Sequence, residues 1–170
     1  MPTDFPFHMA PLADQDRSTF TCGVAALDDY IRHHASQDVK KRIAACFVLL
    51  DETNNNRVAG YYSLAATGIR ADDAPPELAR KLPKYPMIPA TLIGRLASDQ
   101  RYRGRGLGEY LLMDALLKSA VAAKDIGSIA VVVDAKSDQA AWFYRKYGFI
   151  QFPAQPERLF IPMKTVEGLF

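Results

Sequence analysis

Eight residues, Arg101 to Gly108, combine three arginines with three glycines directly ahead of a long apolar segment of helical character. The first N–H groups of a helix have no acceptor within the helix, and the helix dipole adds positive character at that end. Glycines let a ligand approach the backbone without meeting Cβ atoms. The segment therefore predicts a cradle for a phosphate or diphosphate group. The alternative is a glycine-rich turn whose arginines are simply solvated.

The spacing within this segment separates it from two common phosphate-binding loops. No Gly-Lys-Ser/Thr follows, so it is not a Walker A loop, and the third glycine stands at 108 instead of 109, which breaks the Gly-x-Gly-x-x-Gly pattern. The residues fit Arg/Gln-x-x-Gly-x-Gly/Ala, with Arg101, Gly104 and Gly106 at the defined positions.

A second segment with chemical potential is "SDQAAWFYRKYGF", residues 137–149. Ser137 is a candidate N-cap and Gly148 a candidate helix stop, so the pattern predicts a short helix that presents Tyr144. A phenol with a pKa near 10 stays protonated at neutral pH and can act as a general acid. The alternative is that Tyr144 is one more core aromatic beside Trp142 and Phe143.

The elements that must position these groups form a mixed α/β pattern. A helix is predicted over 22–38, with Leu27, Tyr30, Ile31 and His34 along one stripe. The remaining predictions are a buried strand over 43–50, a turn over 51–56, a strand over 57–69 bent at Gly60, a loop over 71–90 with a short helix over 76–82, a strand over 90–99, a helix over 106–124, a strand over 128–135 and a last strand over 159–166. The helix over 106–124 is expected to be well covered, because its leucines and Val121 occupy most of its circumference.

Composition limits the class of protein. The chain has 170 residues, 49% of them hydrophobic, which predicts a single domain over residues 1–170. Its net charge of +2 is too small to indicate by itself a polyanionic partner. Cys22 and Cys46 stand in no CxxC or Cys/His spacing, so no metal site is predicted. The sequence shows neither a signal peptide nor an apolar run near the roughly 20 residues of a membrane span, so we expect a cytoplasmic protein.

Taken together and in this order, the two segments resemble the GNAT superfamily of acetyl-CoA-dependent N-acetyltransferases. The resemblance implies an α/β GNAT fold: a mixed, mostly antiparallel sheet with splayed central strands and flanking helices. It also implies acetyl-CoA as cofactor, backbone pairing of its pantetheine arm with Leu96 and Ser98, and Tyr144 as the catalytic proton donor to the leaving thiolate. The residues expected to bind the cofactor are Leu96, Ala97, Ser98, Arg101, Arg103, Gly104, Arg105, Gly106, Leu107, Gly108, Ser137 and Phe143. Many family members carry Asn at the position of Ser137, so that contact is absent here.

The N-terminal half narrows the resemblance. "FTCGVAALDDYIRHHA" and the "GRLA" that precedes the arginine-rich loop are similar to the GNAT toxins of bacterial toxin–antitoxin systems. This implies acetylation of the α-amino group on charged tRNA, a ribbon-helix-helix antitoxin as partner and a homodimer. Basic clusters, including Arg32 with Lys40 to Arg42, are suited to RNA phosphates. An α-amino group, with a pKa near 7.7 to 8.0, also needs little help from a base, and we find no clear general base.

Two alternatives stay open on the sequence alone. The first is an acetyltransferase for another amine, such as a protein N-terminus, a lysine, a polyamine or an aminoglycoside. Asp72, Asp73 and Glu77 in the proline-rich loop could bind a cationic acceptor. The second is a catalytically silent GNAT-fold module that binds coenzyme A or a partner protein.

Overall fold

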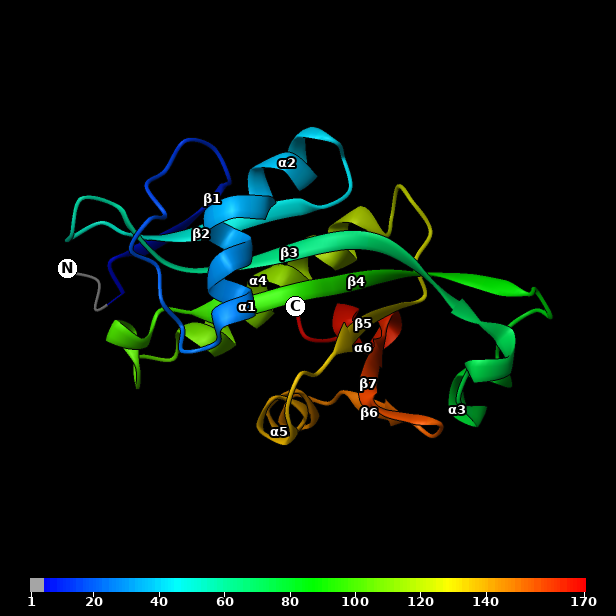
Figure 1. The fold of residues 1–170 in the computed structure, drawn as a ribbon. Coiled ribbons are helices and arrows are strands. Elements are labelled where there is room, and N and C mark those ends of the chain that lie inside the picture. Colours follow the sequence, from blue (N-terminus) through cyan, green and yellow to red (C-terminus); the bar gives the residue numbers. More distant parts are fainter. Residues whose placement is uncertain (1–4) are drawn as a thin grey trace. The chain divides into compact units, whose positions relative to one another are not determined.

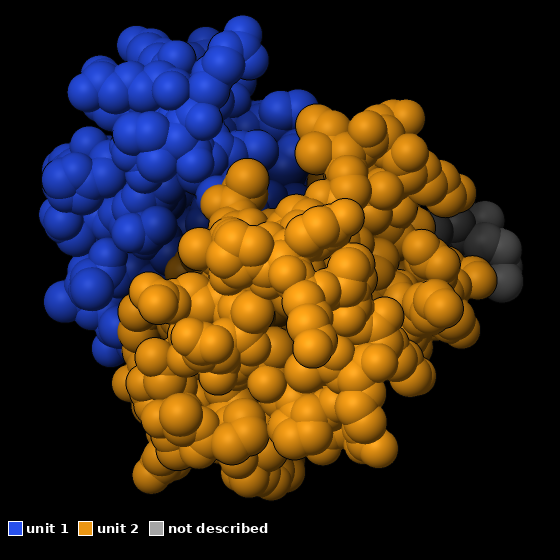
Figure 2. Space-filling view, turned by 90° about the vertical axis from the view of Figure 1, so that its right-hand side faces the viewer, with its two compact units in different colours: residues 1–65, 95–115 blue, residues 66–94, 116–170 orange. Residues whose placement is uncertain are grey.

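A computed structural model describes residues 5–170, so the first four residues of the N-terminal segment lie outside the description. The strands form one seven-stranded sheet in the order β1-β2-β3-β4-β5-β7-β6 (Figure 1). The chain divides into two compact units, which Figure 2 distinguishes by colour. Unit 1 comprises residues 1–65 and 95–115, and unit 2 comprises residues 66–94 and 116–170. The single domain over residues 1–170 stays a prediction.

The sheet of unit 1 begins with an antiparallel meander. It consists of β1 (Phe7–Pro11), β2 (Ala45–Asp51) and the first part of β3 (Arg57–Arg70). The predicted polar turn joins β2 to β3, whereas the helical segment over residues 25–40 lies between β1 and β2. The expected bend at Gly60 is a bulge beside it, because the register shifts from Leu49↔Gly60 to Leu50↔Val58. Strand β1 was not predicted, since "FHMAP" is too short and too weakly alternating to stand out.

Helices cover both faces of this meander, as two adjacent tyrosines on β3 show. The Tyr61 hydroxyl donates to the Leu27 carbonyl (2.7 Å), and the Tyr62 hydroxyl donates to Asp114 (2.6 Å). Because neighbouring strand residues point to opposite faces, α1 (Ala25–Asp29) and α4 (Leu107–Ala122) lie on opposite sides. Gly60 allows the close approach of α4, because a Cβ there would lie 2.8 Å from Leu111 Cδ1.

The predicted helix over 22–38 forms, but with a local change of period. It runs through α1, a π-helical stretch over Tyr30–His34, and α2 (Ala35–Lys40). Tyr30 and Ile31 are buried as expected, whereas His34 is exposed and Ala35 is buried in its place. The wider π turn shifts the buried stripe by one residue, which the assumed period of 3.6 does not anticipate.

Unit 2 contains the parallel part of the sheet. Strand β4 (Met87–Ser98) pairs with β5 (Ala130–Asp134) over Thr91–Ile93 alone, and β5 continues antiparallel to β7 (Gln155–Pro162), which pairs with β6 (Ile150–Phe152). The splay of the central strands stays a prediction. The predicted last strand over 159–166 ends at Pro162, where the chain turns into α6 (Met163–Glu167).

The remaining helices are close to expectation, with one correction. The proline-rich loop forms α3 (Pro76–Ala79), and the segment with Tyr144 forms α5 (Asp138–Lys146). Leu111, Leu112 and Leu116 of α4 are fully buried, but Leu117 and Val121 are 42% and 56% exposed. The expectation that α4 would be well covered was therefore wrong for Leu117 and Val121, because only one face of the helix is buried. In the described part of the chain, no helix has the length and apolar character required to cross a membrane.

Candidate active site

The arginine-rich loop leaves an open row of backbone donors ahead of α4. Gly104 and Gly106 have φ of +78° and +75°, and a Cβ on either would meet no atom within 4 Å. Within residues 5–170, no acceptor is bonded to the N–H groups from Gly104 to Gly108. The glycines therefore serve the backbone conformation and leave space above it, as an anion cradle requires.

Asp99 anchors the loop at its start. Its side chain is completely buried and accepts from the Arg101 amide (2.9 Å), from the Arg101 guanidinium (3.0 and 2.7 Å) and from the Thr21 amide (3.1 Å). Burial alone would raise the pKa of Asp99, but the hydrogen bonds from Arg101 and Thr21 lower it below its usual value. The Arg101 amide and guanidinium are thus committed to Asp99, which makes Arg101 a brace of the loop.

A second carboxylate holds the middle of the loop. Asp51 accepts from the Tyr102 hydroxyl at 2.7 Å, and the ring of Tyr102 is buried. The Arg105 guanidinium lies over the Phe7 ring at 4.9 Å and the Tyr102 ring at 5.8 Å. The loop is therefore fixed on both sides of Gly104 before any ligand binds.

The segment that precedes α1 supports the same loop. The Gln100 amide donates to the Thr21 carbonyl at 2.9 Å, and Arg103 extends to within 3.8 Å of the place where a Cβ of Gly23 would stand. Gly23 itself has a φ of +90°. The "FTCG" pattern, found in the sequence only through resemblance, thus has a physical role in positioning the loop.

The predicted pantetheine segment lies at the end of β4. Ala97 is buried, Leu96 and Ser98 are half-buried, and the Asp99 amide is bonded to the Ala59 carbonyl at 2.8 Å. The β4–β5 ladder ends at Ile93, so Gly94 already lies past it. Backbone pairing between Leu96, Ser98 and a bound arm stays a prediction.

Tyr144 lies in α5 with its ring enclosed and its hydroxyl free. The ring packs edge-on against Phe143 and Phe149, each at 5.3 Å between centroids, and the residue is 8% exposed. Within residues 5–170 the hydroxyl has no hydrogen-bond partner, yet it is not among the buried unpaired polar atoms. Burial raises the pKa of Tyr144 to about 12. The phenol is therefore held protonated and its O–H is available to another molecule.

The other two predicted residues of this helix have internal roles. The Ser137 hydroxyl accepts from the Ala140 amide at 3.1 Å, as predicted for an N-cap. Ser137 also lines a cavity of about 300 Å³ together with Lys136 and Asp138. Phe143 packs on Tyr144 and Tyr147. Direct contact of Ser137 or Phe143 with a cofactor stays a prediction.

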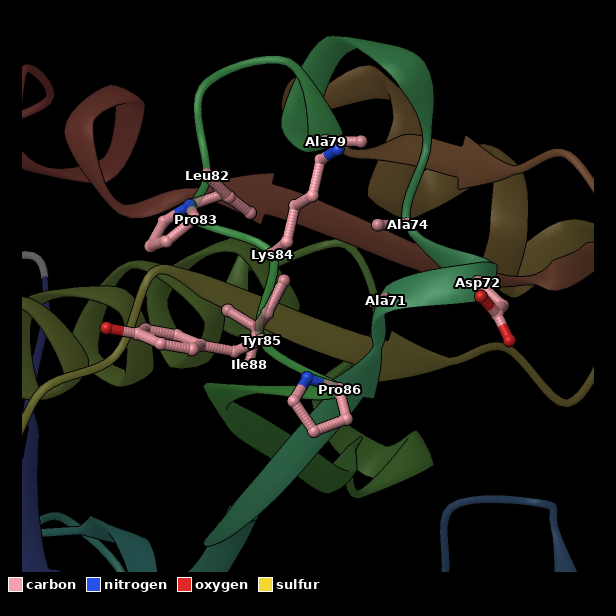
Figure 3. A pocket seen from close by; sticks show the side chains of 10 residues that line it. All are labelled: Ala71, Asp72, Ala74, Ala79, Leu82, Pro83, Lys84, Tyr85, Pro86 and Ile88. Carbon is pink, nitrogen blue, oxygen red and sulfur yellow. The ribbon is translucent and has the colours of Figure 1, made fainter.

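The proline-rich loop of unit 2 forms a pocket of about 480 Å³ with little acidic character (Figure 3). Figure 3 labels Asp72 and Lys84 among side chains that are otherwise mostly apolar, such as Leu82, Pro83 and Ile88. Neither Asp73 nor Glu77 lines it. A polycation site needs several converging carboxylates, and this pocket supplies one beside a lysine.

His8 and His34 lie outside these sites. His8 pairs with Glu52 and His34 with Asp29, both on the surface. Across residues 5–170, no three His, Cys, Asp or Glu side chains lie close enough together to hold a metal ion.

The fold, the open cradle and the buried tyrosine define an acyltransferase of the GNAT class. The acetyltransferase (GNAT) domain family matches residues 42–151, and the chain belongs to this family. It is 36% identical over 154 residues to a tRNA-acetylating toxin of Mycobacterium tuberculosis (strain ATCC 25618 / H37Rv), which covers 91% of this chain and 90% of the relative.

Solved structures agree with this assignment. A tyrosine-to-phenylalanine mutant of KacT superimposes with a TM-score of 0.91 at 29% identity, over 97% of this chain and 99% of KacT. AtaT complexed with acetyl-methionyl-tRNAfMet gives a TM-score of 0.87 at 29% identity, over 96% and 99%. A mutant AtaT bound to the C-terminus of the antitoxin AtaR and acetyl-CoA gives 0.83 at 27% identity, over 97% and 98%. The GNAT fold expected from the sequence is confirmed.

Proposed function

We propose that this protein is a toxin that transfers the acetyl group of acetyl-CoA to the α-amino group of the amino acid on charged tRNA, which blocks translation. The observation that carries the proposal is the open row of N–H donors from Gly104 to Gly108, fixed in a chain 36% identical to a tRNA-acetylating toxin. The complexes of AtaT with acetyl-methionyl-tRNAfMet and with acetyl-CoA support the same substrates.

The cradle explains how acetyl-CoA would be held. Its N–H groups and the positive end of α4 favour the diphosphate, while Arg103 and Arg105 add charge at the rim. Acetyl-CoA supplies the activated acyl group as a thioester. The residues of the chain that we assign to it are those predicted from sequence, except that Arg101 acts through its brace on Asp99.

Tyr144 would assist the loss of coenzyme A as the leaving group. The attacking amine gives up one proton and the thiolate takes one up, so the transfer balances without an external acid. With a pKa of about 12, the Tyr144 phenol is a weaker acid than a thiol, whose pKa is near 8.5. Its O–H therefore stabilises the developing thiolate by hydrogen bonding and passes on the amine's proton, and it does not remain ionised.

The charged-tRNA acceptor accords with the basic residues of unit 1. Arg32 donates to the Phe20 carbonyl, and its Nε is buried with no partner among residues 5–170. Arg32 also lines a cavity of about 420 Å³ together with Arg17 and Asp16, where the Arg17 guanidinium already donates to main-chain carbonyls and to Ser36. Lys40, Lys41 and Arg42 are exposed at the end of α2. Exposed lysine and arginine side chains of this kind favour RNA phosphates over a polycation such as a polyamine or an aminoglycoside.

We infer a cytoplasmic enzyme that acts as a homodimer and is neutralised by a ribbon-helix-helix antitoxin. The bound antitoxin segment in the AtaT–AtaR structure supports an antitoxin of some kind.

A panel of acceptors tests the proposed function. Purified protein and labelled acetyl-CoA are mixed with charged tRNA, uncharged tRNA, a lysine peptide, spermidine and an aminoglycoside. We expect label on charged tRNA alone. Transfer to the peptide or a small amine with none to charged tRNA would contradict the toxin function and favour the alternative acetyltransferase.

A further inference from the structure

Arg95, in the part of β4 that belongs to unit 1, has a guanidinium stacked on an aromatic ring. Its Cζ lies 3.6 Å from the centre of the Tyr30 ring, a close cation–π contact. The residue is half-buried, and within residues 5–170 it has neither a carboxylate partner nor a hydrogen bond. Arginine carries five N–H donors in its plane, so stacking on one face leaves those at the edge free.

The stacking partner is itself fixed. Tyr30 is 4% exposed, and its hydroxyl donates to Asp38 at 2.9 Å across the π-helical stretch. Its ring stacks on that of Tyr61, with 6.3 Å between centroids. The guanidinium therefore rests on a rigid platform, and the plane of its donors is set before any ligand binds.

Arg95 lies next to the part of β4 that is predicted to bind the cofactor. Arg95 directly precedes Leu96, Ala97 and Ser98, the segment assigned to the pantetheine arm. It shares a strand face with Ala97, which is buried in the core cluster that includes Tyr30 and Ile31. The backbone assigned to the arm is one to three residues further along β4, and a strand rises only about 3.3 Å per residue, so Arg95 lies close to that backbone.

We propose that Arg95 binds the terminal phosphodiester of the aminoacyl-tRNA and so orients the α-amino group for attack, an inference that rests on the proposed function. A planar guanidinium with a free edge suits two phosphate oxygens at once. An acceptor amine without a phosphate would make no such contact. Arg95 is thereby a substrate-binding residue that favours charged tRNA over small amines.

The test is the variant Arg95→Met, which keeps an apolar stem on Tyr30 and removes the charge. Loss of a charge-assisted hydrogen bond predicts that kcat/KM for charged tRNA falls about 10- to 100-fold. The affinity for acetyl-CoA and the rate with the methyl ester of the same amino acid stay within about twofold of the wild type. The control Arg70→Met removes an exposed cation at the end of β3 and leaves all three quantities unchanged.

A second readout does not depend on turnover. The slope of log Kd for tRNA against log salt becomes shallower by about 0.7 in Arg95→Met, as expected for one lost contact to single-stranded phosphate. Unchanged kcat/KM and slope would overturn the inference, as would an equal loss with both acceptors or a loss confined to acetyl-CoA. A wild-type enzyme inactive on charged tRNA would instead contradict the proposed function itself.

Discussion

The carboxylate of Asp99 accepts hydrogen bonds from both the backbone amide and the guanidinium of Arg101, two residues further along the chain. The first basic residue of the phosphate loop is therefore turned inward onto a buried anion, with a further bond from its guanidinium to the Thr19 carbonyl at 2.8 Å. This arrangement fixes the loop and leaves Arg103 and Arg105 exposed for a ligand. The functional loop depends on a residue that precedes it.

Replacing Asp99 by Asn should destabilise unit 1. One partner of a buried pair is removed while Arg101 stays about one-third exposed, so we expect a loss of about 2–3 kcal/mol in the free energy of unfolding. Because the folded pKa of Asp99 is lowered, its contribution is complete above the unfolded value near 3.8 and is lost as pH falls below it. Chemical denaturation from pH 7 to pH 3 should therefore show a shallower acid loss in the variant, and identical slopes would refute this role.

A methyl group on the cradle should reduce the affinity for the cofactor. Gly106→Ala places a left-handed alanine at the cradle, which costs about 1–2 kcal/mol, and its methyl projects into the space left for the ligand. We expect Kd for acetyl-CoA to rise about tenfold or more by calorimetry. Gly127→Ala is the matched control, since it also meets open space but lacks a left-handed φ. Equal affinity in both variants would remove the cradle from cofactor binding.

Tyr144→Phe should separate chemistry from binding. Loss of the hydroxyl keeps the ring between Phe143 and Phe149, so we expect turnover to fall about 100-fold or more with little change in acetyl-CoA affinity. Tyr147→Phe, three residues later in the same segment, serves as the control. Full turnover in the Tyr144 variant would exclude it from the mechanism. In cells, we expect expression of the wild type to arrest growth and Tyr144→Phe to relieve the arrest.

The pH dependence of the reaction should reflect the acceptor. The raised pKa of Tyr144 keeps the phenol protonated below about pH 11, so no alkaline loss is expected between pH 6 and 10. The rate should rise through the pKa of the acceptor amine, near or below 7.7 to 8.0. A decline above pH 9 in kcat/KM for charged tRNA would show that another acid, or a less shifted Tyr144, governs the step.

The sequence predicts what local patterns determine. Glycines at 104 and 106 mark a left-handed backbone wherever the loop is folded, and Ser137 with Gly148 marks both ends of α5 from their own chemistry. The cradle and the helix of Tyr144 could therefore be located from residue types and spacing, and the two motifs together led to the family.

Other features depend on contacts between distant segments. The anchoring of Asp99 joins it to Thr21, 78 residues away, and no pattern in the sequence marks that pair. The π-helical stretch and the stacking of Arg95 on Tyr30 arise from packing in the core of unit 1. Leu117 lies on the exposed face of α4, and an apolar sequence does not mark which face of the helix will pack. For the bond between Asp99 and the Arg101 amide, the sequence does carry a local signal. An aspartate at a strand end is typical of an Asx turn, in which its carboxylate accepts from the amide two residues later.

Mass spectrometry of the 3′-terminal aminoacyl-adenosine tests the central claim most directly. Charged tRNA is incubated with the full chain and acetyl-CoA, digested with nuclease and compared with the same reaction of Tyr144→Phe. The account predicts an aminoacyl-adenosine acetylated on its α-amino nitrogen with the wild type and almost none with the variant. An unmodified α-amino group after complete incubation with the wild type, under conditions where the protein binds acetyl-CoA, would contradict it.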